Sequence, residues 1–243
     1  MPNSKIQNHL LATLPADAFE RIAPFLDPIF LSLGEVLYEA GAKLQHIYFP
    51  TTAIISVHNI MENGSSIEII GVGNEGMLGI SLLMGGDTLP GLAVVNTAGH
   101  SYRLKAQILL SEFNSSRSMM NLILSYTQAL IVHISQNVVC NRYHTVEQQL
   151  CRWLLLTLDR LPSNELTITQ ELIASMLGVR REGITEAAGK LQRAGMISYR
   201  RGHISVLDRS GLKARVCECY DVVKSEQERL LCNVRYDKRT VRP

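Results

Sequence analysis

The chain has 243 residues, of which 46% are hydrophobic and 19% are charged. This composition excludes a disordered chain, and the length suits one or two domains with a substantial buried core. No apolar run reaches the roughly 20 residues that span a membrane, and residues 1–9 lack the apolar core of a signal peptide. The sequence therefore predicts a cytoplasmic protein with no membrane partner.

The formal net charge of +2 is unevenly distributed. Residues 1–144 have a balance of −3, whereas residues 145–243 have a balance of +5. A basic second half favours a nucleic-acid partner for that part of the chain.

Residues from about 28 to 105 consist of short β-type runs separated by turn residues. Examples are Gly34–Tyr38, His46–Phe49, Ala53–Val57, Ile67–Val72 and Leu92–Asn96. Asn63-Gly64, between two such runs, is typical of a hairpin because both residues tolerate positive φ. Many short strands at this spacing predict a β-roll, barrel or sandwich.

A heptad pattern follows after about residue 111. The positions spaced 4-3-4-3-4 are Met120, Leu124, Thr127, Ile131, Ile134 and Val138. We call these six residues the dimer seam, because a long helix with such a pattern usually pairs with another helix. Packing on its own β-roll is the alternative, and the flanking apolar residues Ile123, Leu130 and Val139 predict that the helix does both. Residues 141–144 break the pattern and predict a hinge.

The hinge precedes a predicted helix that starts at Thr145, where Thr145 and Gln148 have the spacing of a capping box. Further on, Thr169 is a candidate N-cap, and Gly178 suits the left-handed end of a short helix. A second helix is expected from near Arg180. Two helices joined by a short glycine turn predict a helix-turn-helix.

Residues 195–207 predict a β-hairpin with Arg200-Arg201-Gly202 at its tip, which is the wing of a winged helix. A basic hairpin tip suits contact with phosphates. Helix-turn-helix geometry also occurs as plain packing, but the basic second helix and the wing favour DNA binding.

In these motifs the chain resembles the CRP/FNR family of bacterial transcription regulators. The most specific segments are Leu166–Ala174, Leu177–Glu182 and Gly34–Tyr38. The resemblance implies an α+β protein with a cyclic-nucleotide-binding-like sensor domain over residues 1–110, a jelly-roll-like double-stranded β-helix. A long dimerisation helix and hinge over 111–144 and a winged helix-turn-helix domain over 145–243 would follow. A homodimer would then read an inverted-repeat DNA site, with RNA polymerase as a further partner.

The resemblance also implies roles for individual residues in DNA binding. The residues expected to face the bases are Arg181, Glu182, Thr185 and Glu186. The residues expected to hold phosphates are Thr169, Arg180, Arg200 and Arg201. Many relatives have a basic residue at the position of Glu186, so the half-site sequence is expected to differ.

The family's archetype binds cyclic AMP, and here the sequence departs from its pattern. Glu75 is retained, but no arginine lies between Arg21 and Arg103, and a buried phosphate without a cation would cost several kcal/mol. The resemblance places Leu130, Ile134 and Ser135 of the long helix at the positions that contact the base, and only Ser135 of these three is polar. We expect an atypical branch that does not bind cyclic AMP in the usual mode, with an unknown effector. Glu75 is then either a ribose ligand or a residue that bonds the amides of its own turn.

Other cofactors of such sensors have little support in the sequence. An iron–sulfur cluster would need N-terminal cysteines, and none precedes Cys140. Haem would need an axial ligand such as His46, His58 or His100, although a lone histidine is usually an ordinary polar residue. We predict no cofactor.

The five cysteines are Cys140, Cys151, Cys217, Cys219 and Cys232. Their odd number and spacing favour reduced thiols over a disulfide framework. Cys217-Glu218-Cys219 could bind a metal or sense oxidants, but no second ligand pair is near in the sequence, so no metal site is expected.

Two other classes of function compete with DNA binding. A metal-dependent cupin enzyme would need clustered histidines, and the seven histidines include no His-x-His pair. Nucleophile-elbow and phosphate-binding loop motifs are also absent, so an enzyme is not expected. The remaining alternative is a ligand- or protein-binding sensor scaffold with little direct DNA binding.

Overall fold

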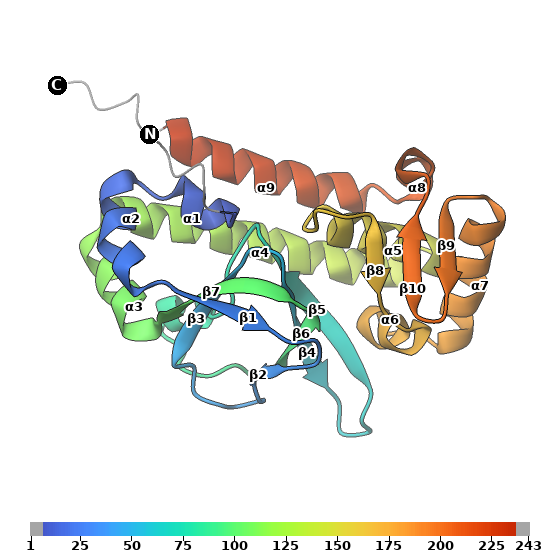
Figure 1. The fold of residues 1–243 in the computed structure, drawn as a ribbon, viewed down its shortest axis with the longest axis horizontal. Helices are drawn as coiled ribbons and strands as arrows, with labels where there is room; N and C mark the ends of the chain where they lie inside the picture. The colour runs from blue at the N-terminus through green and yellow to red at the C-terminus, as the bar shows by residue number, and fades with distance from the viewer. Residues whose placement is uncertain (1–6, 237–243) are drawn as a thin grey trace. The chain divides into compact units, whose positions relative to one another are not determined.

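The computed structural model describes residues 7–236, so residues 1–6, which belong to the N-terminal segment without a signal-peptide core, lie outside the described part. Helices and strands both contribute, as expected for an α+β chain (Figure 1). The chain divides into two compact units. Within the described residues, unit 1 comprises residues 7–57, 70–132 and 225–236, and unit 2 comprises residues 58–69 and 133–224.

The N-terminal part begins with short helices and continues as a β-roll. The helices are α1 (His9–Thr13) and α2 (Ala16–Ile22), followed by the 3-10 turn η1 (Ala23–Phe25). The strands are β1 (Asp27–Leu31), β2 (Val36–Tyr38), β3 (His46–Pro50), β4 (Ile54–Ile60), β5 (Ser66–Val72), β6 (Leu92–Thr97) and β7 (Gly99–Lys105), with η2 (Ile80–Met84) between β5 and β6. They form two sheets with the orders β1-β7-β3 and β2-β6-β4-β5.

Both sheets contribute to one hydrophobic core. Ile47 and Leu104 of the first sheet and Ile55 and Val95 of the second are almost fully buried in it. Two antiparallel sheets that share a core in this way form the expected jelly-roll-like β-roll. The predicted hairpin is also present, since Gly64 joins β4 to β5 with a φ of 82°.

Two helices follow the roll, namely α3 (Ala106–Ser115) and the long α4 (Arg117–Tyr143). One side of α4 packs into the core through Met119, Leu122, Ile123 and Tyr126. By length and apolar composition, α4 is the one described helix that could span a membrane, a criterion that core helices also meet.

The C-terminal part is a winged helix with its own core. Its helices are α5 (Val146–Leu158), α6 (Gln170–Leu177), α7 (Arg181–Arg193), α8 (Arg209–Arg215) and α9 (Cys219–Tyr236). The strands β8 (Glu165–Thr167), β9 (Ile197–Arg200) and β10 (His203–Val206) form a sheet of order β8-β10-β9. The predicted capping box is present at the start of α5, where Thr145 and Gln148 bond each other's backbone amides.

Candidate nucleic-acid interface

The first helix of the helix-turn-helix has the predicted ends. The hydroxyl oxygen of Thr169 accepts a hydrogen bond from the amide of Leu172 at 3.2 Å, which caps α6. Gly178 ends α6 with a φ of 65°, in the left-handed region that favours glycine. Because Arg181 starts α7 only three residues later, the turn is as short as the motif requires.

The second helix, α7, has one buried side and one exposed side. The buried residues are Ile184, Ala187, Ala188 and Leu191, which belong to the core of the winged helix. The four residues predicted to face bases, Arg181, Glu182, Thr185 and Glu186, are all exposed. Helical periodicity therefore separates the predicted contact residues from the residues that anchor the helix.

The wing is a tight hairpin between β9 and β10. Arg200 pairs with His203, so that only Arg201 and Gly202 form the turn. Their φ values are 49° and 81°, and this pair of positive values is typical of the two-residue turns that match strand twist. The turn leaves both Arg200 and Arg201 exposed, as contact with phosphates would require.

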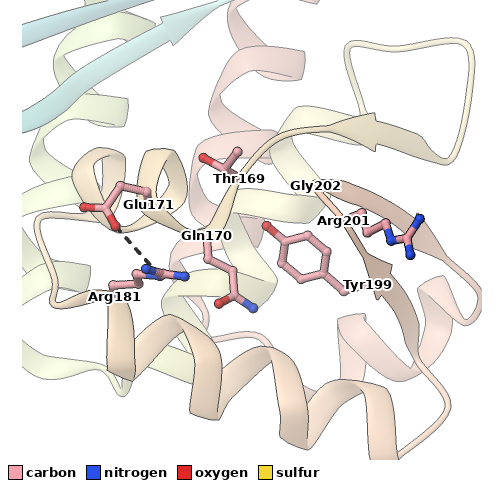
Figure 2. Close-up of a pocket in the computed structure, with 7 residues that line it drawn as sticks. All are labelled: Thr169, Gln170, Glu171, Arg181, Tyr199, Arg201 and Gly202. Carbon is pink, nitrogen blue, oxygen red and sulfur yellow. Dashed lines mark ion pairs between the residues drawn. The ribbon is translucent and has the colours of Figure 1, made fainter.

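A groove of about 490 Å³ lies among the N-terminal ends of α6 and α7 and the wing. Its lining residues are Thr169, Gln170, Glu171, Arg181, Tyr199, Arg201 and Gly202 (Figure 2). Four of these seven were not predicted as site residues, namely Gln170, Glu171, Tyr199 and Gly202. The groove brings Arg181, the predicted base contact, together with Arg201, a predicted phosphate contact.

Arg181 has an acidic neighbour in this groove. Its Nε lies 3.8 Å from Oε2 of Glu171, and both side chains are mostly exposed (Figure 2). Exposed ion pairs contribute about 0–1 kcal/mol, so Arg181 can exchange Glu171 for a nucleic-acid acceptor at little cost. Arg180, the residue before α7, is exposed as well.

Polar contacts also orient the rest of the exposed side of α7. The hydroxyl of Thr185 donates a hydrogen bond to Oε1 of Gln170 at 2.7 Å. Lys190 lies 2.8 Å from Glu186, and this contact lowers the pKa of the Glu186 carboxyl. Glu186 is thus ionised and already paired. The i, i+4 spacing of Glu186 and Lys190 was the sequence signal for this pair.

The candidate effector residues are Glu75 in the β-roll and Ser135 on α4. Both carboxylate oxygens of Glu75 accept a hydrogen bond from the amide of Gly73, at 3.3 and 3.2 Å, which fits the role of a turn residue. The hydroxyl of Tyr126 on α4 bonds the backbone of Met77 in the same loop. Gly76 makes this approach possible, because a Cβ atom at that position would collide with the Tyr126 ring. Ser135 is exposed on α4.

The three histidines considered for haem lie in different strands. His58 in β4 is 4% exposed, and its Nε2 has no hydrogen-bond partner among the described residues. His46 begins β3, and burial lowers its pKa. His100 is exposed in β7 and packs edge-on against Phe30.

The dimer seam is largely exposed. Leu124 is 53% exposed, Ile131 52% and Val138 67%, although all three are large apolar residues on one helix. Ile134 is 36% exposed, and Met120 and Thr127 are half-buried. A row of exposed apolar side chains at heptad spacing is what a helix leaves for a partner helix.

A helix-turn-helix with an exposed second helix and a basic wing defines a winged-helix DNA-binding domain. Residues 148–215 match the family model of the Crp-like helix-turn-helix domain. No curated protein sequence matches the chain.

Solved structures share the fold over most of the chain. FixK2 from Bradyrhizobium japonicum has a TM-score of 0.68 at 14% identity, covering 79% of this chain and 98% of that one. TTHA1359, a CRP/FNR-family transcriptional regulator from Thermus thermophilus, has a TM-score of 0.63 at 19% identity, covering 80% and 98%. The c-di-GMP-responsive global regulator CLP from Xanthomonas campestris has a TM-score of 0.61 at 16% identity, covering 80% and 100%.

The match identifies residues 148–215 as a Crp-like helix-turn-helix domain, and the fold of the whole chain is similar to that of solved CRP/FNR-family regulators. The sequence-based predictions of the fold class and of a helix-turn-helix domain in the second half of the chain are thus confirmed.

Proposed function

We propose that this protein regulates transcription in the cytoplasm by binding an inverted-repeat DNA site as a homodimer. Residues 145–243 would form the DNA-binding part, and residues 1–110 the sensor part. The observation that carries this proposal is the exposed side of α7, where Arg181 lies in one groove with Arg201 of the wing. Such a helix fits the major groove of DNA, and the wing then meets the adjacent backbone.

Some exposed residues of α7 can bond bases directly, whereas another is already paired with a neighbour on the same helix. Arg181 can donate two hydrogen bonds to O6 and N7 of a guanine, and Glu182 can accept one from N4 of a cytosine. Glu186 is tied to Lys190, so that this position presents a paired carboxylate and ammonium group rather than a single positive charge. The half-site preference would therefore differ from that of relatives with a basic residue at this position.

Dimerisation would place two copies of α7 on one side of the duplex. The dimer seam on α4 provides the contact, since its exposed residues Leu124, Ile131 and Val138 need an apolar partner. Two recognition helices that enter successive major grooves are about 34 Å apart, which sets half-sites about 10–11 base pairs apart. RNA polymerase would be the partner through which the bound dimer alters transcription.

The effector of the roll would not be cyclic AMP. The carboxylate of Glu75 bonds its own turn, and Tyr126 bonds the backbone of Met77 in the same loop. CLP is described as responsive to c-di-GMP, but the roll of the present chain offers no arginine between Arg21 and Arg103 for a phosphate.

Selection of DNA from a random pool by the purified full-length protein tests this function. The expected result is an inverted repeat with half-sites about 10–11 base pairs apart, bound with a steep salt dependence. If no sequence is enriched and the protein binds only weakly at low salt, the sensor-scaffold alternative holds instead.

A further inference from the structure

Three cysteines and one histidine that are far apart in the sequence come together in unit 2. Cys140 lies in the last turn of α4, and His144 directly follows this helix. Residues 141–143, predicted as part of a hinge, are the helical end of α4. Cys217 precedes α9 and Cys219 begins it. One ligand atom of each residue lies within 4.8 Å of those of the other three, and all three cysteines are buried. The sequence showed no second ligand pair near Cys217 and Cys219, but folding brings Cys140 and His144 next to them.

The spacing of these atoms matches a single tetrahedral metal ion. The two sulfur atoms of Cys140 and Cys217 are 3.6 Å apart, and Sγ of Cys219 is 3.6 Å from Nδ1 of His144. Around zinc, with Zn–S of about 2.3 Å and Zn–N of about 2.0 Å, neighbouring ligand atoms are about 3.6–3.8 Å apart. An iron–sulfur cluster would spread its thiolates farther apart, because they bind different iron atoms.

The imidazole of His144 has the environment of a metal ligand. Its Nε2 lies 3.4 Å from Oε1 of Glu218, while its Nδ1 faces Cys219. A carboxylate beside one ring nitrogen holds the proton there and leaves the lone pair of the other nitrogen for a metal. Glu218 comes from the same Cys-x-Cys segment as two of the sulfur ligands, so one short segment supplies both the ligands and the orienting carboxylate.

A buried cation next to the sulfur atoms supplies a second, independent observation. Arg152 on α5 is 5% exposed, and its Nε and Nη1 have no hydrogen-bond partner among the described residues. Its charge acts electrostatically on Cys140 and on Cys219. Three thiolates around a divalent ion have a net charge of −1, which a neighbouring guanidinium compensates.

We propose that Cys140, His144, Cys217 and Cys219 bind one zinc ion with structural function. All four positions of the tetrahedron would be filled by the protein, which leaves no open position for a substrate. The ion would join the end of α4, which precedes the winged helix in sequence, to the start of α9 within the winged helix. This site is separate from the DNA-contact residues and does not depend on the proposed DNA recognition.

The test begins with the full-length wild-type protein, purified under reducing conditions and supplied with zinc. Elemental analysis is expected to find about one zinc per chain, and X-ray absorption to find about three sulfur ligands at 2.3 Å and one nitrogen. Cobalt, which replaces zinc in such sites, would give thiolate-to-metal charge-transfer absorption. The Cys217→Ser and His144→Ala variants are expected to lose at least tenfold in zinc affinity.

Cys151→Ser is the matched control, because Cys151 is also a fully buried thiol of the winged helix but lies outside the cluster. This variant should keep its zinc. Wild-type protein that holds no zinc after reconstitution would overturn the proposal. A Cys140–Cys217 disulfide that persists in the presence of a reducing agent would also overturn it, because these two sulfur atoms would then not be available as zinc ligands. The zinc content and the disulfide state are measured on the wild-type protein, so they decide the question even if a variant does not fold. Unchanged zinc content in a folded Cys217→Ser variant would also contradict the proposal.

Discussion

The hydroxyl of Tyr126 makes two hydrogen bonds to one residue, Met77: it accepts one from the amide at 2.9 Å and donates one to the carbonyl at 3.0 Å. Both groups are buried, so α4 is tied directly to the loop that contains Glu75. The same loop is held from the N-terminal side, where the Asn8 amide donates to the carbonyl of Gly76 at 2.8 Å. The carbonyl of Gly76 and both backbone groups of Met77 are thus already paired within the protein.

The first prediction is that the protein binds neither cyclic AMP nor cyclic GMP at micromolar concentration. Binding would have to bury a phosphate without an arginine, since none lies between Arg21 and Arg103, at a cost of several kcal/mol. Isothermal titration calorimetry checks this. Heat of micromolar binding that disappears in the Glu75→Ala variant would show that the loop is a nucleotide site.

The second prediction is that Ile131→Glu weakens the dimer strongly. Symmetry places two copies of residue 131 near each other in the seam, and two charges would be buried among apolar groups. Analytical ultracentrifugation at micromolar concentration should find mostly monomer. Ile60→Glu is the matched control, because Ile60 is 55% exposed and Ile131 52%, but Ile60 lies in β4 rather than in the seam. A full dimer of Ile131→Glu would refute the assignment of the seam.

The third prediction separates Arg181 from Arg201. Arg181→Ala should lose about 1–3 kcal/mol of binding and relax the preference at one base pair of each half-site. Arg201→Ala should weaken all sequences alike and reduce the salt slope by about 1, because it removes one phosphate contact. Binding to a panel of site mutants over a range of salt concentrations distinguishes the two. Arg117→Ala, which removes an exposed arginine from α4, should change neither quantity.

If the two substitutions gave the same uniform loss, Arg181 would be a phosphate contact. The residues that read the bases would then have to be sought elsewhere on α7.

The fourth prediction concerns Asp159, which accepts hydrogen bonds from Tyr220 at 2.9 Å and Lys224 at 2.8 Å and pairs with Arg209. Burial alone would raise the pKa of its carboxyl, but the hydrogen bonds from Lys224 and Tyr220 outweigh burial and lower it. The stabilisation is therefore present above the unfolded pKa of 3.8 and is lost as the pH falls through the lower folded pKa.

Asp159→Asn should thus reduce the free energy of unfolding by about 1–3 kcal/mol at pH 7, and the difference from wild type should shrink below pH 3.8. Urea unfolding at several pH values measures this difference. Asp221→Asn, at an exposed aspartate of α9, is the control and should show little effect. A difference that stays constant with pH would mean that Asp159 acts through packing alone.

The sequence predicted those features that depend on neighbouring residues. Thr169, Gly178 and the Thr145–Gln148 capping box are recognised by local backbone requirements, and the structure confirms each of them. The strand β7 was not singled out, because its residues His100 to Arg103 are mostly polar. It is nevertheless the central strand of its sheet, where pairing with β1 and β3 overrides local preference.

The features that the sequence did not reveal depend on residues brought together by folding. Cys140 and Cys217 are 77 positions apart, and no spacing rule connects them. Gln170 and Thr185 meet only because α6 and α7 cross. Helical periodicity predicted that Arg181 is exposed. It could not predict that Arg181 lies beside Glu171, because this contact joins two different helices.

Gly76 lacks the side chain that would exclude the Tyr126 ring from the loop. The two positions therefore constrain each other's evolution: an alanine at 76 would be tolerated only with a smaller residue at 126. Such a paired replacement would free the backbone of Met77 and leave an opening between loop and helix. Descendants of this sequence that acquire a new small-molecule response should accordingly have changed both positions together, and an alignment of such lineages would carry that correlation.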